Sequence, residues 1–305
     1  MKNLENKKHI TAYHVRKKKI SPFDLFLYLF FGGIIVATLY PFLNVLAISL
    51  NDSMDTVRGM NFIIPRKFTL ANYKKLFTEE ELLQPFIISV SRTVIGTVTN
   101  LIATAMIAYI FSRRDFYFNK LFTIIFIITM YVGGGLVPDY LLIGRTLKLT
   151  NNFLVYILPG LIWVFNILLV RSFIDGLPEA LQESARIDGA NDFVIFYKII
   201  IPLCKPVLAT VALFVAVGQW GSFLDTYFYA RDLPTLQYKL YQILNDTGIT
   251  QNNMHDGNLS ETVASITPQS VRMAITVIVT IPIVVVYPFL QKYFVGGMTL
   301  GAVKS

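Results

Sequence analysis

Six long apolar stretches without a charged residue divide the chain, and polar segments separate them. A helix rises about 1.5 Å per residue, so a run of about 20 apolar residues crosses the roughly 30 Å hydrocarbon layer of a bilayer. Helices also satisfy every backbone polar group there. The pattern predicts an all-α integral membrane protein with six transmembrane helices. The runs are Leu25–Leu50, Thr93–Phe111, Leu121–Pro138, Thr150–Val170, Pro206–Leu224 and Met273–Gln291.

Composition supports a chain that lies largely in lipid. Of its 305 residues, 54% are hydrophobic and only 15% are charged, whereas a typical soluble domain is about 25% charged. The net charge of +8 therefore indicates loops attracted to anionic membrane lipid before it indicates nucleic acid. The one cysteine, Cys204, excludes an internal disulfide, and no thiol or histidine cluster for a metal is present in the sequence.

Lysines and arginines set the expected orientation. Seven lie within the first 21 residues, and Arg113, Arg114 and Lys120 lie in the short link after the second run. Because positively charged loops stay in the cytoplasm, we expect a basic cytoplasmic N-terminal segment at 1–22, one membrane domain at 23–300 and both termini inside. The segments expected outside are about 51–84, 143–149 and 225–270.

The connection between the fourth and fifth runs is a long cytoplasmic segment. Pro178 suits the first turn of a helix and Gly189 suits a left-handed cap at its end, which predicts a short helix at about 178–188. Asn191 suits the start of a second short helix. The two form a hairpin within 175–202. From spacing alone, an amphipathic elbow lying in the lipid headgroups and a docking site for another protein are about equally favoured.

The same segment resembles a known motif. Glu183-Ser184-Ala185, three residues, Gly189, nine residues and then Ile199-Ile200-Ile201-Pro202 is similar to the EAA motif of permease subunits in bacterial ATP-binding-cassette importers. The departures are Ser184 for the usual central alanine and Ile201 for leucine. Asp188-Gly189-Ala190 is similar to the sugar-importer version, and the resemblance extends over most of residues 20–300 to the maltose-type subfamily that takes up complex oligosaccharides.

This resemblance implies a fold, a location and a set of partners. It implies the type I ABC importer permease fold in the bacterial cytoplasmic (inner) membrane, where the chain forms half of the translocation pathway for an oligosaccharide substrate. The implied partners are a second homologous permease, two ATP-binding subunits and an extracytoplasmic solute-binding protein. ATPase coupling is implied for the motif positions Glu183, Ser184, Ala185, Asp188, Gly189 and Ala190.

The residues themselves agree that ATP is handled elsewhere. No GxxxxGK[ST] loop is present, so ATP-Mg must be bound by partner subunits and this chain is expected to hold no cofactor. The three histidines, His9, His14 and His255, lie outside the apolar runs, which disfavours an intramembrane enzyme. We therefore expect a transport subunit, not an enzyme.

Sugars bind to aromatic faces and to hydrogen-bonding side chains, which selects a few candidates in the runs. Gln219 and Trp220 are the best pair, although an interfacial anchor is an equal alternative for Trp220. For Asn100 and Asn166 a helix–helix hydrogen bond is favoured over ligand contact. The remaining candidates are Tyr131 and Asp225.

Two other functional classes stay open on the sequence. A stand-alone channel or secondary carrier needs no ATPase, and a membrane scaffold needs no pathway. Ionisable residues are absent from the middle of the six runs, which disfavours a proton-coupled carrier.

Overall fold

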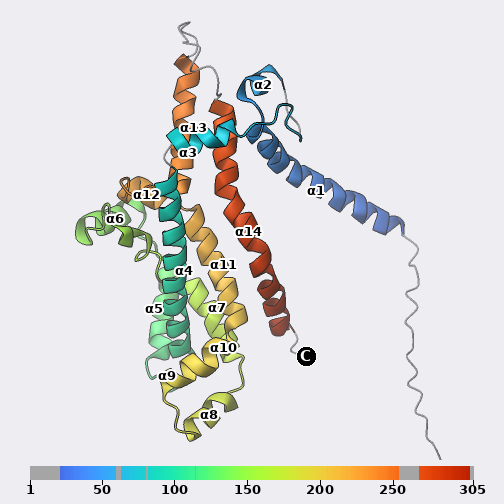
Figure 1. Ribbon diagram of the computed structural model, residues 1–305. Coiled ribbons are helices and arrows are strands. Elements are labelled where there is room, and N and C mark those ends of the chain that lie inside the picture. Colours follow the sequence, from blue (N-terminus) through green and yellow to red (C-terminus); the bar gives the residue numbers. More distant parts are fainter. Residues whose placement is uncertain (1–20, 60–62, 80–81, 114, 254–267, 303–305) are drawn as a thin grey trace, which may run out of the picture.

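The computed structural model describes residues 21–59, 63–79, 82–113, 115–253 and 268–302 (Figure 1). Within these residues the regular structure is helical, apart from one isolated antiparallel bridge between Asn51 and Phe68. The elements are α1 (Pro22–Ser49), α2 (Ser53–Arg58), α3 (Ala71–Glu79), α4 (Leu83–Ser112), α5 (Asn119–Tyr131), α6 (Leu136–Leu141), η1 (Leu142–Thr146), η2 (Phe153–Tyr156), α7 (Val164–Asp175), α8 (Ala180–Ile187), α9 (Asp192–Ile195), η3 (Phe196–Ile200), α10 (Ile201–Leu203), α11 (Lys205–Gly221), α12 (Leu224–Tyr229), α13 (Leu236–Asn253) and α14 (Pro268–Ala302).

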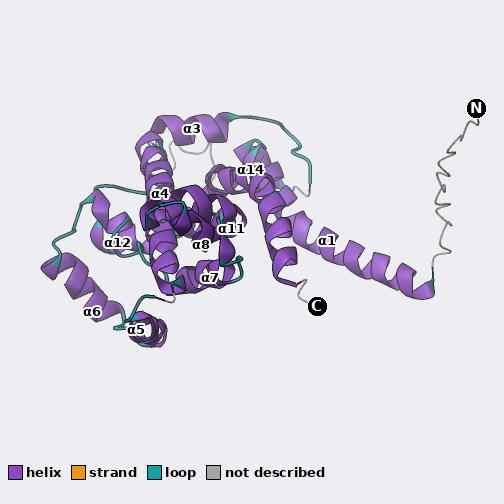
Figure 2. Ribbon diagram, turned by 90° about the horizontal axis from the view of Figure 1, so that it is seen from below, coloured by secondary structure: helices purple, strands orange, loops and turns teal. Residues whose placement is uncertain are grey.

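The centre of the molecule is a bundle in which α4 packs against both α11 and α7 (Figure 2). Its core runs from the middle of α4 to the short helices before α11, and Ala108, Ile167 and Val211 are fully buried in it. The buried face of α4 includes the small residues Gly96, Ala105 and Ala108, which permit close helix packing. This bundle positions both the hairpin at one end and the pocket at the other.

A second core joins α11 to α14, α13 and α3. Trp220, at the end of α11, is buried there among Leu76, Leu236 and Ile275, and its indole N–H donates to the carbonyl of Val279 at 2.9 Å. The bond satisfies the polar atom of an otherwise apolar cluster. The outer ends of α11 and α14 are therefore held together.

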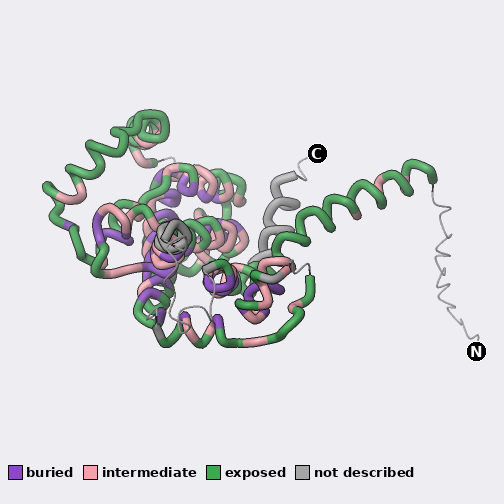
Figure 3. Tube along the Cα trace, turned by 90° about the horizontal axis from the view of Figure 1, so that it is seen from above, coloured by how far each residue is buried: buried purple, intermediate pink, exposed green. Residues whose placement is uncertain are grey.

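Helix α1 stands away from the bundle, as the buried and exposed residues in Figure 3 show. Ser21 and Asp24 form a capping box at its start, with Pro22 in the first turn, an arrangement that satisfies free N–H groups. Only its last turn, Ala47 to Ser49, is buried. A continuous apolar surface of this length is typical of a helix that faces lipid or another protein.

The structure does not confirm the count of six unbroken transmembrane helices. Three helices are long and apolar enough to cross a membrane, Pro22–Ser49, Leu83–Ser112 and Gln269–Pro288, and the number reaches five if two bent pairs each count as one. The bent pairs are α5 with 136–146, at 109°, and 192–203 with α11, at 78°.

Two of the predicted runs do not form one continuous helix. The third ends as α5 at Tyr131, before a glycine run in which Gly135 has φ +84°. The fourth forms only the 3-10 turn η2 and then α7, which starts at Val164. Pro159 lacks an N–H, and the Asn100 side-chain amide donates to the carbonyls of Gly160 and Leu161, at 3.0 Å each. The polar backbone of this break is thereby satisfied without a helix.

Helices from the segments expected outside and inside lie mainly at opposite ends of the molecule, although α6, which precedes the expected outer segment 143–149, lies beside the bundle nearer its middle (Figure 1). α2, α3 and α13 gather at one end, and α8 and α9 lie at the opposite end, the same end as the C-terminal part of α14 (Figure 1). The predicted N-terminal basic segment, except for residues 21 and 22, lies outside the described residues, as do Arg114 and 254–267 of the predicted outer segment.

The linker between α1 and α3 is organised by one buried amide. The Asn72 side chain donates to the carbonyls of Ser49 and Asn51, at 2.9 and 3.0 Å, and accepts from the Ser53 hydroxyl at 2.9 Å. Asn72 is 1% exposed, so these partners replace water completely. The end of α1 is thereby fixed to α3.

We expect Asn72→Ala to lower the free energy of unfolding by about 1–3 kcal/mol, because two buried carbonyls lose their donor. Thermal unfolding in detergent measures the change. Asn245→Ala is the matched control, since Asn245 is exposed and its amide donates only to the nearby Tyr241 carbonyl. Equal effects of the two substitutions would contradict the importance of the buried amide.

Candidate functional site

A hairpin of short helices, 180–203, forms one end of the molecule (Figure 1). The helix expected at about 178–188 is present as α8. Gly189 follows it with φ +81°, the N–H of Gly189 donates to the Arg186 carbonyl at 3.0 Å, and the N–H of Ala190 donates to the Ala185 carbonyl at 2.9 Å. These two bonds form a Schellman motif, which needs a left-handed residue at this position. The predicted glycine cap is confirmed.

The second helix of the hairpin begins as predicted. The Asn191 side chain accepts from the Val194 N–H at 2.9 Å and caps α9. The chain then continues through the π-helix η3 and α10 into α11. The hairpin is therefore joined to α11 by the chain itself, across a bend of 78°.

The six motif residues divide into an inner and an outer set. Ala185 and Ala190 pack against the central core, as the apolar contact of a Schellman motif requires. The exposed residues are Glu183, Ser184, Asp188 and Gly189. Beside them lies Ile187, the last residue of α8, which is 86% exposed. The sequence did not identify it as a surface residue, because an apolar residue at the end of a helix is more often buried.

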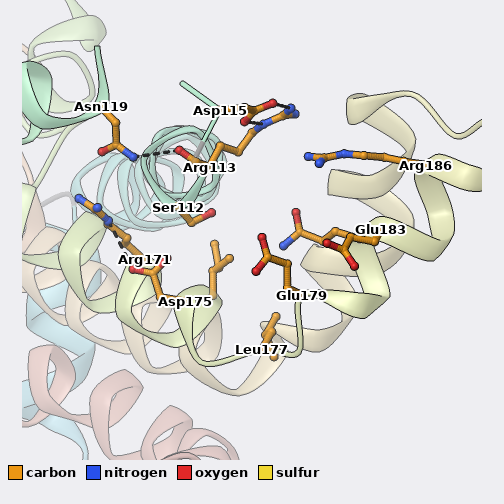
Figure 4. A pocket seen from close by; sticks show the side chains of 12 residues that line it. Ser112, Arg113, Asp115, Asn119, Arg171, Asp175, Leu177, Glu179, Glu183 and Arg186 are labelled. Atoms are coloured by element: carbon orange, nitrogen blue, oxygen red, sulfur yellow. Dashed lines mark hydrogen bonds and ion pairs between the residues drawn. The ribbon is translucent and has the colours of Figure 1, made fainter. Parts of the chain in front are cut away.

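A polar cavity of about 510 Å³ lies between α8 and the ends of α4 and α7. Its lining carries charges of both signs, with Glu179 and Glu183 on the α8 side and Arg113 on the α4 side (Figure 4). Such a mixed lining is suited to hydrogen bonding with a partner's polar surface more than to a single ion. Among the described residues no group of histidine, cysteine or acidic side chains could hold a metal ion.

Arg113, just after α4, connects the hairpin to the bundle. It pairs with Asp115 in its own loop and with Asp192 at the start of α9, and its guanidinium lies 5.9 Å from the ring centre of Tyr109. The hydrogen bond from Arg113 lowers the pKa of Asp115 to about 2. Because the pKa of Asp115 is lower in the folded chain than its ordinary value near 4, its ionised form stabilises the fold above that value. This stabilisation is lost as the pH falls toward 2.

Two further contacts close the loop around this end of the bundle. The Asn119 side-chain amide donates to the carbonyls of Phe111 and Arg113, at 2.8 and 3.0 Å, and ends the turn between α4 and α5. Arg171 on α7 donates to the Thr123 hydroxyl on α5 at 2.8 Å. These bonds tie α4, α5 and α7 together beside the hairpin.

A second pocket, of about 330 Å³, lies toward the other end of the bundle. Its volume falls within the range typical of small-ligand sites. Aromatic and polar side chains converge on it from α4, α11, α12 and the break before α7. The main ones are Arg92, Tyr156, Trp163, Gln219, Asp225 and Tyr229.

The structure separates the four predicted pathway residues. Gln219 lines the pocket, whereas its neighbour Trp220 points into the core with α14. Tyr131, at the end of α5, is 84% exposed. Asn166 is 1% exposed, and its side-chain nitrogen has no hydrogen-bond partner among the described residues. Asn100 forms a polar packing contact, as the sequence favoured, but with non-helical backbone.

Four of these pocket residues were not among the sequence candidates: Arg92, Tyr156, Trp163 and Tyr229. Arg92 lies between the expected outer segment 51–84 and the second apolar run, which starts at Thr93, so it was not among the candidates in the runs, although α4 already begins at Leu83. Trp163, 49% exposed, belongs to a run that was predicted to be continuous helix. A charged residue flanked by apolar residues in both directions was the signal that could have identified Arg92.

The comparisons with known proteins place the chain in a family. Residues 100–300 match the family described as binding-protein-dependent transport system inner membrane component, and the chain belongs to it. It is 37% identical over 287 residues to Protein LplC of Bacillus subtilis (strain 168), covering 93% of this chain and 95% of that protein. It is 34% identical over 285 residues to the polygalacturonan/rhamnogalacturonan transport system permease protein YtcP of the same organism, covering 93% and 98%.

A solved structure agrees with these relatives. The fold is similar to a chain of a bacterial ABC transporter involved in the import of the acidic polysaccharide alginate, with a TM-score of 0.77 and 29% sequence identity over 89% of this chain and 96% of that one. The resemblance to permeases of carbohydrate importers is confirmed, and the all-helical fold is that of this permease family.

Gly189→Ala is expected to destabilise the hairpin by about 1–2 kcal/mol, through backbone strain alone. A methyl group there would meet no atom within 4 Å, so no clash contributes. Amide hydrogen exchange across 180–200 should be faster in Gly189→Ala than in the native chain. Asparagine tolerates the left-handed region better than alanine, so the exchange rate of Gly189→Asn should lie between those of Gly189→Ala and the native chain. Equally fast exchange in Gly189→Asn and Gly189→Ala would argue against backbone strain as the cause.

Proposed function

We propose that this chain is the permease subunit of an ATP-driven oligosaccharide importer and forms half of its translocation pathway with a second homologous permease. The observation that carries the proposal is the hairpin: a Schellman-capped helix with an exposed apolar tip, Ile187, at the end of a helix bundle of the importer-permease family. An exposed apolar side chain beside polar ones is typical of a protein interface.

The partner proposed for this surface is one of the importer's two ATP-binding subunits, and ATP-Mg is bound by those subunits. Glu183, Ser184 and Asp188 supply exposed polar contacts, while Ala185, Gly189 and Ala190 fix the shape of the helix end. The second half of the hairpin is held to the end of α4 by the Arg113–Asp192 ion pair and leads through η3 and α10 into α11. A displacement of α8 is therefore proposed to tilt the bundle through these helices. ATP binding then shifts the balance between inward-facing and outward-facing states.

The proposed location is the bacterial cytoplasmic (inner) membrane. A basic segment at 1–22 precedes one permease domain at 23–300, with both termini in the cytoplasm, as the positive charges in the sequence favour. The hairpin and the C-terminal part of α14 share one end of the molecule, which agrees with this orientation. An extracytoplasmic solute-binding protein is proposed to deliver the sugar at the other end.

The pocket that Gln219 lines is proposed as part of the sugar pathway. Trp163 and Tyr229 offer aromatic faces there, and Gln219 offers an amide, the two kinds of group that bind sugars. Tyr131, exposed on α5, and Asn166, with its unpaired buried amide, remain proposed pathway residues. For Trp220 the buried hydrogen bond to Val279 favours a packing role. The relatives' names support an oligosaccharide or polysaccharide fragment as the substrate.

Ile187→Asp tests the docking surface. Placing a carboxylate at the exposed apolar tip should weaken association with the ATPases by about tenfold, equivalent to roughly 1.4 kcal/mol. Copurification and binding measurements on the full complex provide the readout. Val57→Asp, at an exposed apolar position of α2 at the opposite end of the molecule (Figure 1), is the control. Unchanged association in Ile187→Asp would contradict the docking assignment. It would favour instead a stand-alone channel or carrier, or a membrane scaffold.

Trp163→Ala and Trp220→Ala separate pathway from packing. Trp163→Ala should lower oligosaccharide uptake in liposomes, since a stacking face is lost, while unfolding temperature and basal ATP hydrolysis persist. Trp220→Ala should lower the free energy of unfolding by about 3–5 kcal/mol, the usual cost of truncating a buried aromatic side chain. If Trp163→Ala transports normally and unfolds early, the two roles are reversed.

A further inference from the structure

Arg92 on α4 is a fully buried arginine with every donor occupied. Only 2% of the surface of Arg92 is exposed. A guanidinium has five N–H groups, and five hydrogen bonds leave it. Two go to the Gln219 side-chain oxygen, at 3.1 and 3.0 Å, one goes to the Ser222 carbonyl at 3.3 Å, and two go to the Asp225 carboxylate, at 3.1 and 2.5 Å. The ring centre of Tyr156 lies 4.4 Å from the guanidinium carbon.

The three acceptors lie on both sides of one break in the helices. Gln219 is in the last turn of α11, Ser222 is in the two-residue break after it, and Asp225 is in the first turn of α12. Arg92 itself belongs to a third element, α4. One planar, rigid fork therefore joins α4, α11 and α12, and α12 carries Tyr229 into the wall of the pocket.

The neighbouring backbone is shaped to permit this contact. Gly96 follows Arg92 by one turn on α4, and a methyl group there would lie 2.8 Å from the Gln219 amide nitrogen. That amide is not free to move aside, because it donates to the Tyr156 carbonyl at 3.1 Å while its oxygen accepts from Arg92. The glycine thus admits the amide that links α11 to the fork.

Such an arrangement is unsuited to holding a ligand's negative charge. The charge of Arg92 is opposed by Asp225 in the same cluster, and no N–H remains for a sugar hydroxyl or carboxylate. A satisfied, buried ion pair instead fixes the relative position of the segments that supply it. The Thr226 hydroxyl also holds α12, to the hydroxyls of Tyr156 and Thr235 at 3.0 and 3.1 Å, but it is the Arg92 fork that ties α12 to α4.

We propose that Arg92 is a positioning residue that makes α12 move with α4 and α11 as one body, so that the outer wall of the pocket follows the movement of the hairpin. This proposal rests on the proposed function, because α11 begins directly after the hairpin that the ATPases are proposed to move. Arg92 acts through Asp225 and Gln219, and it need not contact the sugar.

Two substitutions disturb the fork in different ways. Arg92→Lys keeps the charge but replaces the fork by a point charge that cannot reach all three acceptors. Gly96→Ala leaves every charge in place and displaces only the Gln219 amide. The matched control is Arg231→Lys, because Arg231 is exposed and donates to the nearby Tyr227 carbonyl.

The main readout is a distance across the joint. Spin labels are placed on Leu224 of α12 and Ile110 of α4, both exposed, in a Cys204→Ala background of the full complex. Ile110 lies 18 residues beyond Arg92 in the sequence, or about 27 Å along the helix. Pulsed electron paramagnetic resonance then gives the distance distribution with and without trapped ATP.

We expect one narrow distance, unchanged by ATP, in the native complex and in Arg231→Lys. In Arg92→Lys and Gly96→Ala the distribution should broaden, and uptake per ATP hydrolysed should fall about tenfold while hydrolysis without substrate stays within about twofold. A narrow, unchanged distance in both variants, or a native distance that changes with ATP, would overturn the proposal. If Arg92→Lys fails to assemble, Gly96→Ala alone decides.

The two proposals fail in different ways. The spin-label distances need no transported sugar, so a wrong substrate assignment would leave native uptake absent but the narrow distance intact. Broadening in the variants without any loss of coupling would show that the joint exists but does not serve transport, which also overturns the role given to Arg92.

Discussion

The packing of α4 against α11 is the contact on which the rest of the molecule depends. Ala108 on α4 and Val211 on α11 are fully buried in this core, and Gly96 admits the Gln219 side chain between the same helices. Close-packed interiors transmit displacement instead of absorbing it. The hairpin at one end and the pocket at the other are therefore attached to a single stiff element.

Broken helices at membrane depth require polar side chains to satisfy their free backbone groups. Asn100 supplies donors to the break before α7, and Arg92 supplies one to the break after α11. Asn119 does the same for the turn after α4, at the hairpin end. Burying any of these polar side chains in an apolar environment costs free energy. In each case a hydrogen bond to a backbone carbonyl offsets that cost.

The sequence predicted the local features well because they depend on residues close together in the chain. The helix at 178–188, its left-handed Gly189 and the Asn191 cap were all predictable, since capping involves neighbours within a turn or two. The alanines of the motif acquire a reason only in the structure. Ala185 and Ala190 are the two apolar positions of the Schellman motif and pack on the core.

What the sequence determined by itself was the class of protein, through apolar runs of membrane length, clustered lysines and arginines and the spacing of the hairpin motif. What only the tertiary structure decided was which runs are continuous and which polar residues meet. Arg92 and Asp225 are 133 residues apart and pair across two helices. Trp220 and Gln219 are adjacent, but Trp220 packs into the core with α14 whereas Gln219 lines the pocket. Periodicity fixes the secondary structure that a segment favours, whereas long-range contacts depend on how the helices pack.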